Sequence, residues 1–306
     1  MTSLFEQPRF QSPDAAREHL EAVRWPQGPV CPHCGAVDRI TKLQGKSHRP
    51  GLYDCGHCRD QFTVTVGTVF ERSKIPLHKW LLAATLFAAS KKGMSAHQLH
   101  RMLGVTYKTA WFMAHRLREA MKDDGGGLLG GGGKTVEVDE TYWGNKQPKG
   151  SFGKKGKGPH HQMQVVTLVE RGGRARSFQM LTVYASTVQK LLKDNVKHGT
   201  TIHTDESSIY RSLWRHYPHD TVKHRAGEYS RNGVTTNTVE GFFSILKRGL
   251  VGTFHHVGEQ HLHRYVAEFD FRYSYRSALG VSDAERADLL LKGISGKRLM
   301  YRRTHA

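Results

Sequence analysis

The chain has 306 residues, which is enough for a substantial core and for two or three domains. Its formal net charge is +19 at pH 7, before any contribution from its 20 histidines. Such an excess indicates a polyanionic partner, with nucleic acid as the default and an anionic membrane surface as the alternative. The sequence contains no basic amphipathic helix with a clean apolar face, so a membrane partner is not favoured.

The start of the chain and its apolar runs bear on its location. The first ten residues, MTSLFEQPRF, lack the charged and then apolar layout of a signal peptide. The longest apolar run, Trp80 to Ala89, is too short to cross a bilayer. We therefore expect a cytoplasmic protein.

All four cysteines fall into two C-x-x-C pairs, which follow an expected amphipathic helix at residues 15–23. In a reducing compartment this clustering indicates a metal site, and the spacing fits a Cys₄ zinc ribbon with short strands around the pairs. A redox C-x-x-C motif is the alternative, but two paired motifs outside a βαβ context argue against it. Four thiolates leave no open position on the ion, so we expect structural Zn²⁺ bound by Cys31, Cys34, Cys55 and Cys58.

Residues 73–123 change to helical periodicity, and three helices are expected at 77–90, 96–103 and 107–121. A helix, a glycine-containing turn and a second helix form the helix-turn-helix pattern of DNA-binding domains. The third helix would suit the major groove, and its basic candidates for DNA contact are Lys108, Arg116 and Arg118. The alternative is an ordinary helical bundle with a solvated basic face.

The run DDGGGLLGGGG marks the clearest domain boundary in the chain, and residues 124–134 are expected to form a flexible linker. A phosphate-binding loop is not indicated, because no buried strand precedes the glycines and the motif lacks its usual spacing.

Beyond the linker the pattern becomes rich in strands. Three strands in a row are followed by helix, strand, helix, strand and helix, which is the order expected of an RNase H-like α/β domain. Its first three strands form an antiparallel meander, and its later strands add in parallel. In chain order the expected elements are 135–139, 162–169, 177–183, 188–196, 200–203, 207–216, 221–224 and 233–249.

The last of these helices carries one narrow polar stripe on an otherwise apolar surface. Asn237, Glu240, Ser244 and Lys247 recur at helical spacing. The start of the helix can be capped by Thr235, Thr236 or Asn237, and Gly249 can end it. Such a stripe belongs either to a surface helix or to the wall of a polar site.

Two aspartates upstream favour the polar site. Asp139 is expected at the end of the first strand and Asp205 at the end of the fourth, and these strands are neighbours in the expected sheet. Both carboxylates then reach one edge, where Glu240 approaches from the helix. Three converging carboxylates repel one another unless a cation lies between them, and oxygen ligands favour Mg²⁺ or Mn²⁺. Two such ions can support an in-line phosphoryl transfer.

The motifs of the chain resemble those of a known family. The zinc ribbon and the helix-turn-helix, followed by VEVDETYWG, HTDESSIY and TNTVEGFFSILKRG, resemble the DDE insertion-sequence transposases of the ISXO type, from about Trp25 to Arg276. The resemblance implies a catalytic triad of Asp139, Asp205 and Glu240, with Lys247 as an accessory base that contacts DNA phosphate. Some members of that family use Asn at the third acidic position, so Asn237 remains an alternative to Glu240.

Several other charged residues lie near the expected catalytic positions. Glu137, Glu140 and Glu206 are interpreted as structural. A basic, glycine-rich loop follows the first strand, and it is either a solvated loop or a clamp on the DNA backbone. DNA-binding candidates outside the helices are Lys154, Lys155 and Lys157 in this loop and Arg225 beyond the fifth strand.

These inferences predict five segments and one activity. The segments are an N-terminal helix with a zinc ribbon at 1–72, the helix-turn-helix at 73–123, the linker at 124–134, the RNase H-like domain at 135–280, and a C-terminal helix with a basic tail at 281–306. The predicted activity is that of a transposase that binds the ends of an element in double-stranded DNA, cleaves there and joins the strands to target DNA, assembled as a homo-oligomer. The alternatives are a non-catalytic DNA-binding regulator and an RNase H-like nuclease or resolvase that cuts without joining.

Overall fold

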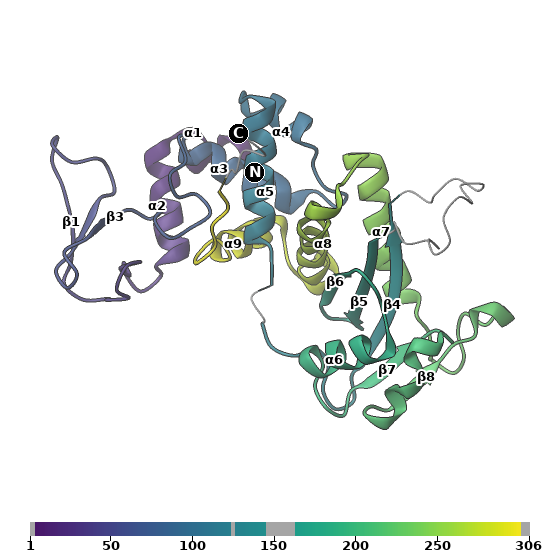
Figure 1. Cartoon of the computed structure of the whole chain (residues 1–306). Helices are drawn as coiled ribbons and strands as arrows, with labels where there is room; N and C mark the ends of the chain where they lie inside the picture. The colour runs from purple at the N-terminus through teal and green to yellow at the C-terminus, as the bar shows by residue number, and fades with distance from the viewer. Residues whose placement is uncertain (1–3, 124–125, 145–162, 301–306) are drawn as a thin grey trace, which may run out of the picture. The chain divides into compact units, whose positions relative to one another are not determined.

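The computed structural model describes residues 4–123, 126–144 and 163–300 (Figure 1). The chain forms two compact units, which are described separately. The first contains Met1–Lys122 and Gly280–Ala306, and the second contains Asp123–Leu279. No described helix is both long and apolar enough to cross a membrane.

The first unit begins with short helices and a small antiparallel sheet. Ser12 accepts the N–H groups of Asp14 and Ala15 and so caps the helix that follows it. Three aromatic rings, those of Trp25, Tyr53 and Phe62, pack against one another at centroid distances of 5.4–5.8 Å and join the sheet to the end of that helix. The elements are η1 (Leu4–Glu6), α1 (Pro8–Gln11), α2 (Pro13–Arg24), β1 (Ile40–Lys42), β2 (Tyr53–Cys55) and β3 (Gln61–Phe62).

Three helices follow with sharp local boundaries. Ser95 and Gln98 form a reciprocal capping box at the start of the middle helix, and Gly104 ends it in the left-handed region at φ 60°. Thr106 then caps the third helix. The helices are α3 (Leu77–Ala89), α4 (Ala96–Leu103) and α5 (Tyr107–Ala120).

The C-terminal helix α9 (Asp283–Lys292) belongs to this first unit. It packs on α3, and the Arg286 guanidinium donates to the Ala88 carbonyl at 3.1 Å. Beyond the helix, Lys297 Nζ donates to the carbonyls of Ala120 and Lys122. The expectation of a separate C-terminal segment at 281–306 therefore differs from the structure, in which residues 280–300 complete the helical core of the first unit.

The glycine-rich segment after α5 also differs from the expected flexible linker. The described part, from residue 126 onward, is fastened to the second unit. Leu129 is fully buried, and its backbone pairs with Asn195 and Lys197 at 2.8 and 2.9 Å. Gly130 N–H donates to the Glu170 carboxylate at 2.8 Å.

A five-stranded mixed sheet organises the second unit. The spatial order is β6-β5-β4-β7-β8, with antiparallel pairs from β4 to β5 and from β5 to β6, and parallel pairs from β4 to β7 and from β7 to β8. This arrangement confirms the predicted RNase H-like mixed α/β class. The strands are β4 (Thr135–Trp143), β5 (Met163–Glu170), β6 (Ala175–Met180), β7 (Thr201–Thr204) and β8 (His219–Thr221).

Helices cover both faces of this sheet, as the alternating sides of β5 illustrate. Met163 and Val165 pack in one apolar cluster with α7 and α8, whereas Val166 and Leu168 pack in another with α6. The covering helices and turns are α6 (Ala185–Asn195), η2 (Ser208–Arg215), η3 (His224–Ala226), α7 (Asn237–Gly249), η4 (Leu250–Phe254), α8 (Glu259–Ser274) and η5 (Ser277–Leu279).

Several boundaries in this unit differ from the sequence prediction. The helix expected at 207–216 is a 3₁₀ helix, and the strand expected at 221–224 lies two residues earlier. Helix α7 begins at Asn237, with the candidate cap Thr236 at its N-cap position, and Gly249 is its last residue, as expected. The chain then continues directly into the π turn η4.

Candidate active site and metal centre

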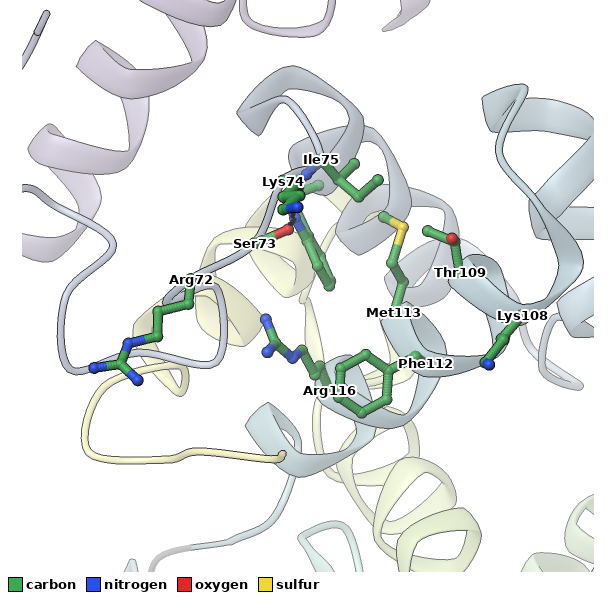
Figure 2. A pocket seen from close by; sticks show the side chains of 10 residues that line it. Arg72, Ser73, Lys74, Ile75, Lys108, Thr109, Phe112, Met113 and Arg116 are labelled. Carbon is green, nitrogen blue, oxygen red and sulfur yellow. Dashed lines mark hydrogen bonds between the residues drawn. The ribbon is translucent and has the colours of Figure 1, made fainter. Parts of the chain in front are cut away.

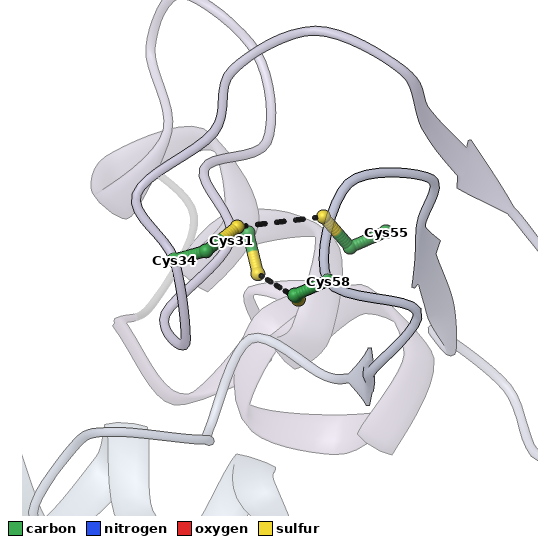
Figure 3. Close-up of side chains that lie close together, drawn as sticks. All are labelled: Cys31, Cys34, Cys55 and Cys58. Carbon is green, nitrogen blue, oxygen red and sulfur yellow. Dashed lines mark hydrogen bonds between the residues drawn. The ribbon is translucent and has the colours of Figure 1, made fainter.

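The four cysteines form a compact thiolate cluster in the zinc-ribbon region (Figure 3). Their Sγ atoms all lie within 4.8 Å of one another, and the Cys31–Cys58 and Cys34–Cys55 pairs are each 3.7 Å apart. Zinc at about 2.3 Å from four sulfurs requires sulfur–sulfur distances of about 3.8 Å, so the cluster has the dimensions of a tetrahedral zinc site. The N–H groups of Cys58 and His57 also lower the pKa of Cys55 to about 6, which favours a thiolate.

In the second unit, parallel pairing of β4 with β7 brings the two predicted aspartates to one level of the sheet. Glu137 pairs with His203, so Asp139 and Asp205 each lie two residues further along neighbouring strands. Asp205 directly follows the end of β7, as predicted. Asp139 lies in the middle of β4 and not at its end, because β4 continues to Trp143 in antiparallel pairing with β5.

Burial dominates the electrostatics of the two aspartates. It raises the pKa of Asp139, the Glu140 N–H opposes this shift, and the carboxylates of Glu140, Asp205 and Glu240 add to it, so that the pKa reaches about 8. Burial also raises the pKa of Asp205, which accepts the Ser207 N–H at 2.9 Å. The interaction among these acids supports the expected convergence of three elements on one site.

Glu240 projects from the first turn of α7 and is held through one oxygen. Its Oε1 accepts the Thr236 hydroxyl at 2.8 Å and lies 3.2 Å from His224 Nε2. The same imidazole nitrogen lies 2.9 Å from the Thr236 hydroxyl oxygen. Because Thr236 gives its only hydroxyl proton to Glu240, the histidine nitrogen is the donor to that hydroxyl.

Glu206 connects this histidine to the second aspartate. Its carboxylate accepts the backbone N–H groups of His224 and Arg225 at 2.8 and 3.1 Å. Glu206 directly follows Asp205 at the end of β7, and His224 in η3 contacts Thr236 and Glu240 at the start of α7. The turn η3 therefore connects the end of β7 to the start of α7 through side-chain contacts. The sequence indicated only a structural role for Glu206, because nothing local connects it to His224 or Glu240.

The start of α7 rests on a buried carboxylate from β4. Glu137 is fully buried and accepts the N–H and hydroxyl of Thr238, each at 2.8 Å, and the N–H of Val239 at 3.0 Å. Arg171 Nε completes the set at 2.7 Å. Glu137 therefore caps α7 from another element and positions Glu240, in agreement with the structural role inferred for it.

The remaining nitrogens of Arg171 tie down the loop before α7. They donate to the carbonyls of Gly233 and Thr235 at 2.9 and 3.0 Å and approach His203 Nδ1 at 3.1 Å. His203 is nearly buried, so it is a structural contact in the wall of the site. Arg171 is a contributor that periodicity did not single out, since it lies in the turn between two strands.

The exposed stripe of α7 leads away from Glu240. Asn237 lies one turn before Glu240 and Lys247 two turns after it, and both are exposed. Arg225 is also exposed and lies 3.7 Å from Glu206. The DNA-binding candidates Lys154, Lys155 and Lys157 lie outside the described residues.

The basic candidates on α5 have different environments. Lys108 is exposed in the first turn. Arg116 is half-buried and donates to the carbonyls of Leu299 and Glu71. Arg118 is only 2% exposed and lies over the Phe87 ring at 5.5 Å, so the structure contradicts its predicted contact with DNA. The apolar stripe of α5 did not predict this burial, because both α3 and α9 pack against α5.

The two candidate metal centres differ in compactness. Among the described residues, the four cysteines are the only set of three or more ligand groups packed within 4.8 Å. Asp139, Asp205 and Glu240 are spread more widely, yet they influence one another and supply the oxygen donors that suit a hard divalent cation. The donor chemistry therefore fits a cation held among the three acids.

Comparisons with known proteins identify the family of the chain. Residues 128–274 match the family model of the ISXO2-like transposase domain, and residues 11–61 match that of a transposase zinc-ribbon domain. An uncharacterised protein in the transposable element ISH50 of Halobacterium salinarum is 30% identical over 277 residues, which cover 86% of this chain and 91% of that protein.

A solved structure, that of a pre-cleavage Mos1 transpososome, matches with a TM-score of 0.28 and 10% identity over 71% of this chain and 79% of that chain, and a likeness this low carries no argument. The chain belongs to the family of ISXO2-like transposases of insertion sequences and carries a zinc ribbon of the transposase type.

Proposed function

We propose that the chain is a metal-dependent DNA transposase whose catalytic residues are Asp139, Asp205 and Glu240. The observation that supports this proposal is the strand register that brings Asp139 level with Asp205, with Glu240 close enough to act on Asp139. Burial first, and then the carboxylates of Glu140, Asp205 and Glu240, raise the pKa of Asp139 to about 8, and a divalent cation would stabilise its ionised form. Membership of a transposase family supports DNA as the substrate of this site.

The three acids would hold Mg²⁺ or Mn²⁺, which when bound polarises phosphate oxygens and stabilises charge during phosphodiester cleavage and strand transfer. The protein side chains supply the positioning. Glu137 anchors the first turn of α7, and the Thr236 hydroxyl with His224 holds Glu240 Oε1. Lys247, exposed on the same helix, would bind a DNA phosphate beside the site.

Glu240 is proposed as the third ligand in preference to Asn237. Its carboxylate contributes to the raised pKa of Asp139 and is oriented by two neighbours. Asn237 is exposed one turn away, and only its backbone N–H is engaged, by the Thr235 hydroxyl.

The first unit is proposed to bind the ends of the element. Its Cys₄ cluster would hold structural Zn²⁺, whose fit rests on the 3.7 Å sulfur spacings. Helices α4 and α5 form the proposed helix-turn-helix, with Lys108 and Arg116 facing the DNA. Since two ends must be brought together for transposition, the active form is proposed to be a homo-oligomer on DNA.

A strand-transfer assay tests the proposal with a labelled element end, Mg²⁺ and plasmid target. The wild-type chain should cleave and join, whereas Asp139→Asn, Asp205→Asn and Glu240→Gln should each retain end binding and lose both steps. Full activity of Glu240→Gln together with loss in Asn237→Ala would move the third ligand to Asn237.

Two other results would replace the proposal. End binding without cleavage by the wild-type chain would favour a regulator, and cleavage without joining would favour a nuclease or resolvase.

A Lys247→Gln variant should weaken DNA binding by the loss of one phosphate contact. The expected result is a reduction of about one in the slope of log K against log salt.

A further inference from the structure

A cavity of about 300 Å³ in the first unit lies between α5 and the segment that precedes α3 (Figure 2). Its lining contains several cationic side chains and several apolar side chains, and it includes no acidic residue. The cationic members are Arg72, Lys74, Lys108 and Arg116, and the apolar members are Ile75, Trp80, Phe112 and Met113.

Arg116 is the most constrained of the four cations. Its Nε and Nη1 donate to the carbonyls of Leu299 and Glu71 at 3.3 and 3.2 Å, and its guanidinium carbon lies 4.8 Å from the centre of the Phe112 ring. Burial, and then the charge of Arg298, lower its pKa. The guanidinium is therefore held rigidly and partly desolvated at the edge of the cavity.

No carboxylate of the described chain forms an ion pair with Arg116. The nearby Glu71 is engaged elsewhere, since its Oε2 accepts the Gly67 N–H at 3.0 Å and its Oε1 lies 3.6 Å from Arg72 Nε. Two carbonyl groups and the Phe112 ring contact the Arg116 guanidinium, and the charge of Glu71 acts on it without an ion pair. A half-buried cation with this surrounding is stabilised by an anion in the adjoining cavity.

The other cations make the positive potential stronger. Lys74 is exposed and forms no ion pair within the described residues. Lys108 lies in the first turn of α5, which contains no acid, so its charge adds to the positive end of the helix dipole instead of opposing it. Such a placement is unfavourable for the helix alone and favours an anionic ligand.

We propose that this cavity binds one phosphodiester group of the DNA backbone, with the cations around the phosphate and the apolar lining against its sugar. The proposal rests on the proposed DNA binding by the first unit and goes beyond it. It adds the segment before α3 to the DNA-binding surface, and it makes Lys74 and Lys108 partners of the same phosphate.

The dependence of duplex binding on salt tests this shared contact. The probe is a fluorescent DNA duplex of random sequence, and its anisotropy is followed over a range of salt concentrations without divalent cations. Each neutralised phosphate contributes about 0.9 to the slope of log K against log salt. The double variant Lys74→Gln/Lys108→Gln should therefore lower the slope by about one, because both side chains act on one phosphate. Independent contacts would lower it by about two, which would overturn the proposal.

A cavity-filling variant separates the pocket from its surface charge. Thr109 lines the cavity, and Thr109→Phe removes no charge while it occupies the space. This variant should lower the slope by about the same amount of one. An unchanged slope would show that the lysines act on open DNA and would overturn the proposal.

The matched control is Lys91→Gln, which removes the charge of an exposed lysine just after α3. This lysine does not line the cavity, so its removal should leave the salt slope at the wild-type value. Thermal unfolding should show that every variant folds. The assay needs neither metal nor cleavage, so its result does not depend on catalysis. Absence of DNA binding by the wild-type chain would instead contradict the proposed function itself.

Discussion

Replacing Glu137 by glutamine should loosen the start of α7 while it leaves the shape of the side chain nearly unchanged. In the wild-type chain, each carboxylate oxygen accepts two hydrogen bonds. Oε1 receives Arg171 Nε and the Thr238 hydroxyl, and Oε2 receives the N–H groups of Thr238 and Val239. The amide of glutamine places an NH₂ group opposite two donors, whichever way it is turned.

The magnitude follows from those contacts. A hydrogen bond to a charged group contributes about 1.5–3 kcal/mol, and the substitution removes two of them. Loss of one partner of a buried ion pair destabilises a protein by about 3–5 kcal/mol, in agreement with that sum. We therefore expect the free energy of unfolding of the second unit to fall by about 3–5 kcal/mol.

Calorimetry of the full chain provides the measurement. In a unit of this size, about 1 kcal/mol shifts the unfolding temperature by roughly 2–4 °C, so the transition of the second unit should fall by roughly 10 °C. The transition of the first unit should stay in place and serves as an internal reference. Glu259→Gln, the same chemical change at an exposed position, should alter stability by less than about 0.5 kcal/mol.

A fall of less than about 1 kcal/mol in Glu137→Gln would refute the reasoning, since two charged hydrogen bonds could not then be lost. The start of α7 would have to be held by Arg171 alone or by the apolar contacts of Val239.

Four further changes have defined outcomes. Without divalent cations, the raised pKa of Asp139 contributes stability that is complete below about pH 4 and is lost as pH rises through about 8, so Asp139→Asn should flatten this decline in calorimetric scans made with a chelator. Cys31→Ser should reduce bound zinc from one ion per chain and lower the unfolding temperature of the first unit, as metal analysis and calorimetry will show; a full zinc content would contradict the ribbon site. Arg118→Met should leave the salt slope of DNA binding unchanged, because the guanidinium is buried over Phe87, and a reduced slope would restore its predicted role in DNA contact. His224→Ala should weaken Mn²⁺ binding, measured by electron paramagnetic resonance, roughly 10-fold or more, and His224→Gln should restore part of it by keeping an N–H donor; equal loss in both variants would indicate a purely structural role.

Local signals account for the features that were predicted well. Helix α4 has the predicted limits, because its capping box and its left-handed Gly104 lie within the helix ends themselves. The thiolate cluster also follows from spacing alone, since each C-x-x-C pair is one tight turn. The order of strands and helices was sufficient to predict the sheet topology.

Contacts from distant segments account for the errors. The anchoring of α7 could not be predicted, because the acceptor of its first N–H groups is Glu137, a hundred positions earlier in the chain. The glycine-rich segment has the composition of a linker, yet burial of Leu129 against α6 holds it in place. The polarity of Arg118 indicated a surface position, but the packing of α3 and α9 around α5 buries it.

The sequence by itself determined the order of the elements, the cysteine cluster and the three acids, because periodicity, caps and short motifs are properties of neighbouring residues. Only the tertiary structure decided which of those groups are oriented and how. The strand register brings Asp139 level with Asp205, and the contacts of Glu137, Glu206 and His224 hold Glu240 beside them. Such contacts join residues far apart in the chain, and their formation depends on the folding of the whole unit.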